Sequence, residues 1–132
     1  MAALLKQIDN PRVKIGFNMA NSFLTGEDPE LALHNLKDQI AHVRAVDVRL
    51  AHQDEEPQMG DYVGCVIGLG LVPLKRLFRV LQAEGYEGWI SLEFTGLEEA
   101  HFGTEASLKN LRQCLHELQY EAMHPEESTE SP

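Results

Sequence analysis

The sequence predicts an α/β fold with a parallel sheet, and two observations carry this prediction. Helical and extended patterns alternate along the chain in the order helix, strand, helix, strand, helix, strand, helix. Such alternation is typical of βαβ units, in which helices join parallel strands by right-handed crossovers. Residues 89–94 form the clearest strand, because Trp89, Ser91 and Glu93 alternate with three apolar residues at a period of two.

The first helix and the first strand occupy the N-terminal part of the chain. Residues 2–8 predict a short amphipathic helix that ends before Asn10-Pro11, since the residue before a proline disfavours helical backbone. No capping residue precedes this helix, which suggests that the chain is a piece of a longer protein. Residues 13–18 follow as a strand with one apolar face, while Asn18 lies on its other face.

The middle of the chain predicts a second helix and a second strand. Residues 21–27 are expected to form a loop, after which Asp28 and Pro29 occupy the N-cap and the first position of a helix. The apolar stripe of this helix consists of Leu31, Leu33, Leu36 and Ile40. Residues 40–47 form the second strand, and a long polar loop is expected over residues 49–62.

Two further helices flank the strand at residues 89–94. Pro73 begins the first of them, and Gly85 follows its last turn, where left-handed backbone favours glycine. Its buried stripe is predicted to consist of Leu74, Leu77, Phe78 and Leu81. Residues 104–122 predict the final helix, whose apolar face consists of Leu108, Leu111, Leu115 and Leu118.

Composition limits the classes of partner and compartment. A chain of 132 residues with 43% hydrophobic residues is expected to form one domain, which we place at residues 1–122. The formal net charge of −10 argues against nucleic acids and anionic membranes as partners. Residues 123–132 are expected to be a disordered acidic tail. The chain has no signal segment or long apolar run, which favours a cytoplasmic protein with reduced thiols at Cys65 and Cys114.

Several single residues allow both a functional and a structural interpretation. Glu93 stands at the C-terminal end of a predicted strand, where parallel α/β folds place their chemistry, but a structural ion pair is the alternative. His42 shares a face with Arg44, and we expect a satisfied core or helix-end histidine rather than a metal ligand. Trp89 is expected to pack in the protein rather than against a sugar. The segment Gly68-Leu69-Gly70 lacks the lysine of a phosphate-binding loop and is expected to turn the chain into the next helix.

Three segments resemble the sugar isomerase/epimerase superfamily, whose members have xylose isomerase-like TIM barrels and include inosose dehydratases and tagatose epimerases. Residues 16–29 look like a strand that ends in an Asp-x-x-His segment, followed by a Gly-x-Asp-Pro helix start. Residues 40–47 look like the family's histidine-x-lysine-aspartate strand, and residues 67–93 look like its Gly-Glu-Gly loop and final strand. The resemblance covers roughly residues 10–118. It implies that the βαβ units correspond to the last three strands of an incomplete TIM barrel.

The resemblance also implies a function and a set of site residues. Its members carry out metal-assisted isomerisation or epimerisation of a sugar or polyol, with Mn, Mg or Zn bound at the C-terminal mouth of the barrel. Glu93 matches the last carboxylate ligand and Asp47 matches the aspartate of the second motif, so these two would be the catalytic residues. Asn18, Asn21 and Arg44 stand at positions that hold an aspartate, a histidine and a second histidine in the family. These three are candidates for substrate binding.

The departures from the family pattern predict a site without metal. The guanidinium of Arg44 cannot ligate a divalent cation and would repel it. Asn18 and Glu93 alone fall short of a transition-metal site, and Leu69 replaces the glutamate of the Gly-Glu-Gly loop. We therefore hypothesise that Arg44 pairs with Glu93 in place of the metal. No cofactor is expected, and Glu93 is the one ligand that would remain if the family site were retained.

Three parallel strands cannot close a barrel, and the two outer strands would expose unpaired edges. We expect the chain to associate with copies of itself or with a partner that carries the missing strands, or else to repack as a small open domain. Two functions stay open: an impaired isomerase or epimerase of a small sugar or polyol, and a non-catalytic module that binds a small polar or anionic ligand. A subunit that completes another half-barrel is a third interpretation.

Overall fold

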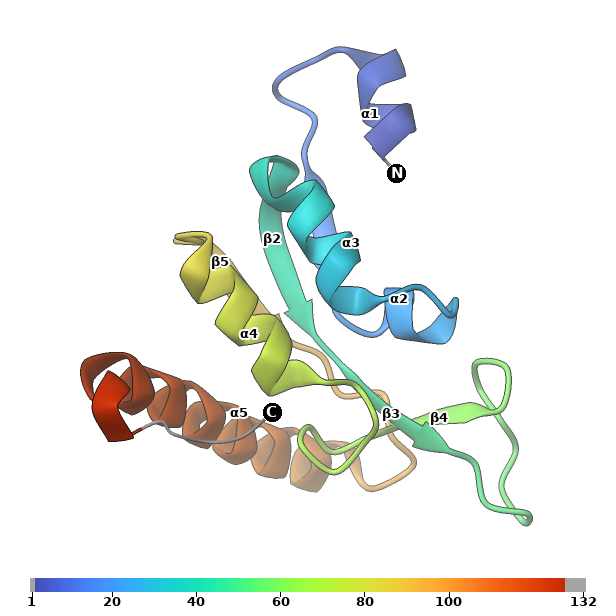
Figure 1. Cartoon of the computed structure of the whole chain (residues 1–132). Coiled ribbons are helices and arrows are strands. Elements are labelled where there is room, and N and C mark those ends of the chain that lie inside the picture. The colour runs from blue at the N-terminus through green and yellow to red at the C-terminus, as the bar shows by residue number, and fades with distance from the viewer. Residues whose placement is uncertain (1, 128–132) are drawn as a thin grey trace.

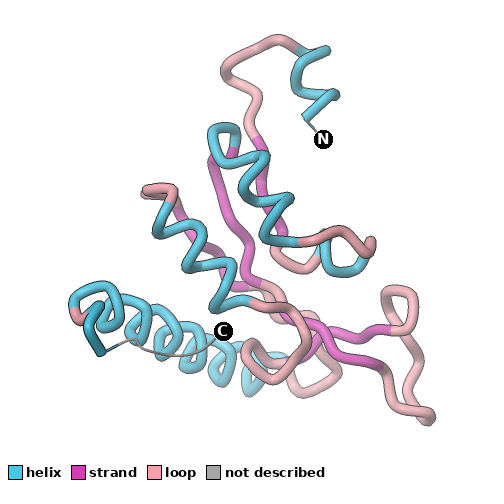
Figure 2. Tube along the Cα trace, viewed as in Figure 1, coloured by secondary structure: helices cyan, strands magenta, loops and turns pink. Residues whose placement is uncertain are grey.

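The computed structural model describes residues 2–127, and Figure 1 shows how they are arranged. The helices are α1 (Ala2–Ile8), α2 (Asn21–Leu24), α3 (Pro29–Leu36), α4 (Leu74–Ala83) and α5 (Ala100–Met123), with 3-10 turns η1 (Lys37–Gln39) and η2 (Pro125–Glu127). The strands are β1 (Ile15–Asn18), β2 (Ile40–Ala45), β3 (Asp47–Leu50), β4 (Tyr62–Cys65) and β5 (Trp89–Leu92). Figure 2 shows the alternation of helix and strand that the sequence predicts for most of the chain.

Three of the strands form a parallel sheet in the order β1-β2-β5. Helices α3 and α4 lie side by side over one face of this sheet (Figure 1). In the described part of the chain, β1 and β5 each pair with β2 alone, so the sheet stays open and no barrel closes. The predicted α/β class, with parallel units of an incomplete barrel, is confirmed.

An antiparallel pair of strands departs from the prediction. The chain continues from β2 through Val46 into β3, which pairs with β4 so that Asp47 lies opposite Cys65. The residues predicted as one strand, 40–47, thus form β2 and the first residue of β3, which continues to Leu50, so the predicted loop at residues 49–62 is too long. The physical reason is burial, because Val48 and Val63 have no exposed surface and stabilise two strands that flank a polar loop.

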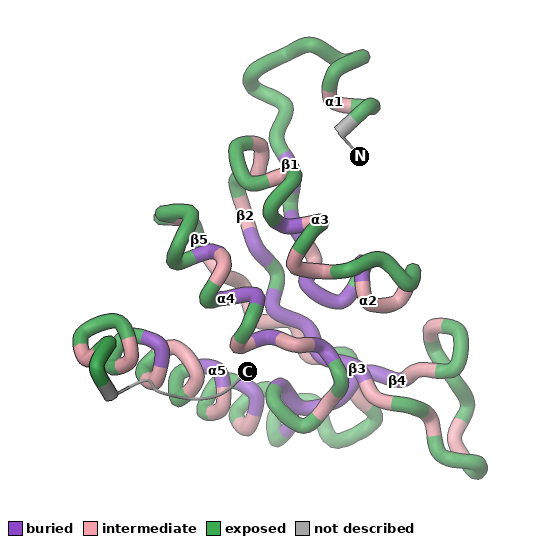
Figure 3. The backbone as a smooth tube through the Cα atoms, in the orientation of Figure 1, coloured by how far each residue is buried: buried purple, intermediate pink, exposed green. Residues whose placement is uncertain are grey.

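The hydrophobic core lies between the parallel sheet and the helices (Figure 3). Alternate strand residues point into it, with Ile15 and Phe17 from β1 and Val43 and Ala45 from β2. The helices contribute Leu33, Leu74, Leu77, Phe78, Leu81, Leu111 and Leu118. Because this set fills one face of the sheet, the other residues of β1 and β2 must point to the opposite face.

The helix ends follow local sequence signals. The carboxylate of Asp28 accepts hydrogen bonds from the first turn of α3, and Gly85 has a φ of 75° just beyond α4, so both predicted boundaries are confirmed. The predicted loop at residues 21–27 contains the short helix α2 instead. Helix α5 begins at Ala100 rather than at residue 104, because the Glu99 carboxylate accepts from two backbone N–H groups of its first turn.

Other side chains do not lie where the periodicity places them. Trp89 is 83% exposed, so the prediction that it packs inside the protein is wrong; the open sheet provides nothing opposite it. Leu31 is 57% exposed on α3, and Ile40 belongs to β2 rather than to the helix stripe.

Of the predicted tail, α5 and η2 include residues up to Glu127, and residues 128–132 lie outside the described part. Within residues 2–127, no helix has the length and apolar character needed to cross a membrane.

Candidate functional site

The candidate site lies on the open face of the parallel sheet, opposite the core. Parallel pairing places Asn18, Arg44 and Ser91 in one row across the three strands, near the ends of β1 and β2. A second row consists of Gly16, His42 and Trp89. A Cβ atom added to Gly16 would meet no atom within 4 Å, which shows that this face is uncovered.

Arg44 and Glu93 form an ion pair on this face. The Nη1 atom of Arg44 lies 3.5 Å from the Oε2 atom of Glu93, and the two side chains are 48% and 40% exposed. Glu93 follows β5 directly, and its backbone N–H donates to the carbonyl of Ala45, which holds it beside β2. Its Oε2 atom is buried and accepts no hydrogen bond, so the guanidinium charge is its electrostatic partner.

Asn18 lies next to Arg44 in the strand row, and Asn21 follows β1 at the start of α2. The side-chain oxygen of Asn18 accepts from the N–H of Ala20 at 2.9 Å, which forms a turn at the end of β1. Asn21 is exposed at the start of α2. Both asparagines line a groove of about 440 Å³ beside β1. Within residues 2–127, no hydrogen bond or ion pair joins either of them to Arg44 or Glu93.

Asp47 is buried, with 1% of its surface exposed, and it faces the loop before α4. Its two oxygens accept backbone N–H groups at 2.9 to 3.1 Å; the donors are Val48, Gly68, Gly70 and Val72. Burial raises the pKa of this carboxyl, and the four amide bonds oppose that shift. The structure thus places Asp47 away from Glu93, in a bonding pattern that holds the loop in shape.

Two glycines shape the loop before α4, and burial makes Cys65, which precedes the loop, unreactive. A Cβ atom at Gly70 would lie 2.3 Å from an oxygen of Asp47, so a side chain there would displace the carboxylate. Gly68 adopts a φ of 91°, which favours glycine, and the pair turns the chain toward α4. Burial raises the pKa of the Cys65 thiol to about 12, so this free cysteine is not a nucleophile at neutral pH.

His42 and Ser91 form a close polar pair beside the ion pair. The Nε2 atom of His42 lies 2.6 Å from the Oγ atom of Ser91, on neighbouring strands. The hydrogen-bond partner that we expected for His42 is therefore a serine hydroxyl. Ser91 is a site residue that the sequence interpretation did not single out, although its period-two relation to Glu93 places it on the same face.

Residues 1–114 match the family described as xylose isomerase-like TIM barrel. The match covers most of the chain and includes every strand. The chain belongs to this family. Its open sheet is a part of that barrel, and the row Asn18–Arg44–Ser91 lies on the side that faces the barrel interior.

Curated relatives agree with this assignment. The inosose dehydratase of Lacticaseibacillus casei is 29% identical over 100 residues, and that of Geobacillus thermodenitrificans (strain NG80-2) is 31% identical over 98 residues. Each match covers 68% of this chain but 33% of the relative. The chain thus spans about a third of the length of these relatives.

Solved structures with the same fold are also longer. A xylose isomerase domain protein from Planctomyces limnophilus superposes with a TM-score of 0.70 at 20% identity, covering 89% of this chain and 42% of that chain. A D-tagatose 3-epimerase-like protein superposes with a TM-score of 0.68 at 24% identity, covering 92% of this chain and 42% of that chain. At these identities the similarity concerns the fold alone.

The family implies a divalent metal, and the described residues do not fit one. No group of three or more histidine, cysteine, aspartate or glutamate side chains within residues 2–127 could hold a metal ion. Glu93 is paired with a guanidinium, and the amide oxygen of Asn18 already accepts a backbone hydrogen bond. A cation at this position would be repelled by Arg44 and would have too few anionic or imidazole ligands.

Proposed function

We propose that this chain binds a small sugar, polyol or related anionic ligand on its open sheet face without a divalent metal. We also propose that the isomerisation or epimerisation associated with its fold family is impaired in this chain. The observation that carries both parts is the ion pair between Arg44 and Glu93, since the family resemblance assigns metal ligands to these two positions. The guanidinium supplies a fixed positive charge where a metal would supply two.

The groups around this pair suit a polyhydroxylated ligand. Arg44 presents donors for a carboxylate, phosphate or carbonyl oxygen. His42 and Ser91 can each exchange a hydrogen bond with a hydroxyl group, and the half-exposed carboxylate of Glu93 is a further acceptor. The exposed ring of Trp89 lies in the row next to Arg44 and offers an apolar surface to the carbon side of a sugar ring.

The same geometry explains why proton-transfer chemistry would be impaired. Proton transfer beside a carbonyl needs a base near the substrate and an electrophile that polarises the oxygen. Asp47 is buried and engaged by four amides, so it is not available as that base. Leu69, which stands at the position of the family's loop glutamate, is 71% exposed and carries no acid–base group.

A binding experiment with a charge-removing variant tests the proposal. We expect inosose, the compound in the relatives' name, or a sugar phosphate to raise the melting temperature of the full chain by several degrees in the presence of EDTA. We expect Arg44→Met to abolish this shift and Arg44→Lys to retain part of it.

The matched control is Lys109→Met, which removes an exposed cation from α5 and should leave the shift unchanged. Stabilisation that requires added Mn²⁺ or Zn²⁺, or that persists in Arg44→Met, would contradict the proposal. Turnover of either compound by the metal-free chain would contradict the proposed impairment.

A further inference from the structure

The two edge strands of the parallel sheet, β1 and β5, run in the same direction, and within the described residues each is unpaired on its outer side. Because all three strands run parallel, the free edge of β5 in one copy can pair with the free edge of β1 in another and continue the same parallel sheet.

A groove of about 440 Å³ lies beside the free edge of β1. Its apolar lining comes from Ile15 and Phe17 on β1 and from Ala32 and Leu36 on α3. Glu27 lies on its rim, exposed, with no side-chain partner among the described residues. In parallel α/β folds a helix covers the two strands that it connects, so this groove has the position of a helix that would precede β1. No residue of α1 lines it.

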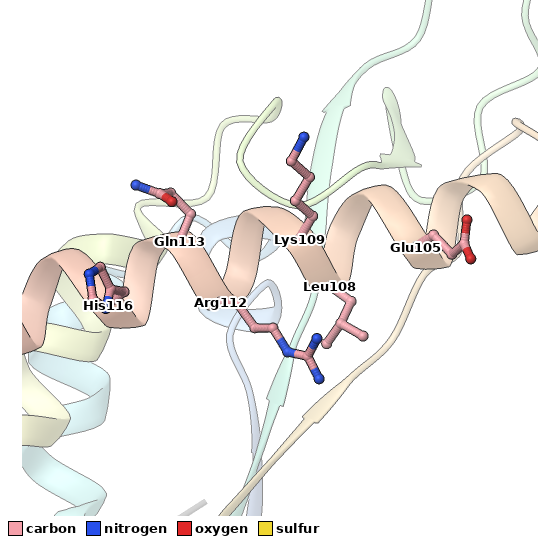
Figure 4. Close-up of a pocket in the computed structure, with 6 residues that line it drawn as sticks. All are labelled: Glu105, Leu108, Lys109, Arg112, Gln113 and His116. Atoms are coloured by element: carbon pink, nitrogen blue, oxygen red, sulfur yellow. The ribbon is translucent and has the colours of Figure 1, made fainter.

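One side of helix α5 is exposed and carries an apolar and a basic residue, which suit the apolar groove and the acidic Glu27 beside β1. The helix follows β5, and no strand follows it within residues 2–127. Figure 4 shows Leu108 and Arg112 projecting from one side of this helix, while Lys109 and Gln113 project from the other. Leu108 is 37% exposed, and Arg112 has no ion-pair partner in the described part of the chain.

Neighbouring helices in this chain are joined by ion pairs, which indicates how α5 would meet a further helix. Arg76 of α4 pairs with Glu30 of α3. On the other side of α4, Lys75 and Arg79 both pair with Glu121 of α5. Cations of α4 thus meet acids of both neighbouring helices. Arg112 on α5 and Glu27, in the loop before α3, are an exposed cation and an exposed acid without an ion-pair partner among the described residues, and they could make the same kind of contact.

We infer that two copies of this chain associate head to tail, with β5 of each copy paired to β1 of the other. Leu108 of α5 enters the groove beside β1 of the second copy, and Arg112 meets Glu27 there. The arrangement has a twofold axis and contains this contact twice, so it closes rather than forming a fibre. The two open faces then face each other, so that Trp89 and the polar rows around Arg44 of both copies line a shared interior.

Charge-reversal variants test this contact. We expect the wild-type chain to be a dimer by size-exclusion chromatography with light scattering. Arg112→Glu or Glu27→Lys should each weaken the dimer by about tenfold or more, because each places like charges at both contacts. Mixing the two variants should restore a dimer, since every contact in the mixed pair joins opposite charges.

Lys109→Glu is the matched control, because it makes the same change of charge as Arg112→Glu on the other side of α5 and should leave the dimer intact. A wild-type chain that is monomeric at all accessible concentrations would overturn the inference. So would a dimer that both charge reversals leave unchanged, or a mixture of the two variants that does not reassociate, because the contact would then lie elsewhere.

Discussion

Arg44 lies in the middle of the open sheet face, in a row with Asn18 and Ser91. At its present exposure its ion pair with Glu93 contributes little to stability, about 0–1 kcal/mol, because water screens both charges. The importance of the pair is therefore chemical. It fixes a positive charge on the open sheet face, and under the proposed function this charge favours anionic and polar ligands.

Asp47 provides a prediction about stability at the scale of one side chain. We expect Asp47→Asn to lower the free energy of unfolding by about 2–3 kcal/mol, since the amide group would turn N–H donors toward backbone N–H groups. Chemical denaturation measures the change. Asp54→Asn is the control, because Asp54 is exposed and its removal should change stability by less than about 0.5 kcal/mol. Equal effects of the two substitutions would contradict this account of Asp47.

Strand alternation predicts more about the position of Asp47 than the family motif does. Side chains alternate along a strand, so Asp47 and Arg44, three residues apart, point to opposite faces. The family motif alone suggests that both belong to one site. Alternation correctly placed Arg44, Ser91 and Glu93 on one face. The four amide donors could not be predicted, because they depend on how the loop at residues 66–72 folds.

At the scale of elements, the hairpin β3–β4 carries a loop held by one ion pair. Arg49 on β3 donates to both oxygens of Glu55, at 2.7 and 2.8 Å, and the N–H of His52 donates to the same carboxylate. The hydrogen bonds from Arg49 are the main cause that lowers the pKa of Glu55, to about 2. The polar run at residues 54–56 is thus partly ordered, although the sequence alone indicates only a solvated loop.

The lowered pKa of Glu55 predicts how this loop responds to acid. The folded value lies below the ordinary value of 4.5, so the stabilisation is present above pH 4.5 and is lost as the pH falls toward about 2. NMR titration of the Glu55 carboxyl should give a midpoint near 2 in the wild-type chain. In Arg49→Met the midpoint should return toward the ordinary range. A wild-type midpoint near 4.5 would show that the pair does not form in solution.

The sequence predicts the parallel part of the fold better than the antiparallel part. Strands β1, β2 and β5 have alternating patterns beside capped helices, so local signals and the crossover rule suffice to place them. Strand β4 is short and follows a polar loop, and only the burial of Val63 in the folded protein identifies it. The prediction that Trp89 is packed inside the protein is wrong because it assumes a closed sheet, whereas this sheet is open.

At the scale of the whole molecule, the chain is a three-stranded part of a barrel with an antiparallel hairpin. The core on its helix side is continuous, while the opposite face is polar and open. This asymmetry places the candidate site and the two free strand edges on surfaces that another polypeptide can cover. The net charge of −10 makes such association depend on local complementary charges such as Arg112 and Glu27.

The central claim is that Arg44 stands in place of a metal ion, and metal retention tests it most directly. The full chain is loaded with excess Mn²⁺ or Zn²⁺, desalted and measured by mass spectrometry of its metal content. The double variant Asn18→Asp, Arg44→His is carried in parallel, because it places an aspartate and a histidine beside Glu93 and should gain affinity for the metal. We predict far less than one metal ion per wild-type chain and a higher content in the double variant. One ion retained per wild-type chain would contradict the claim.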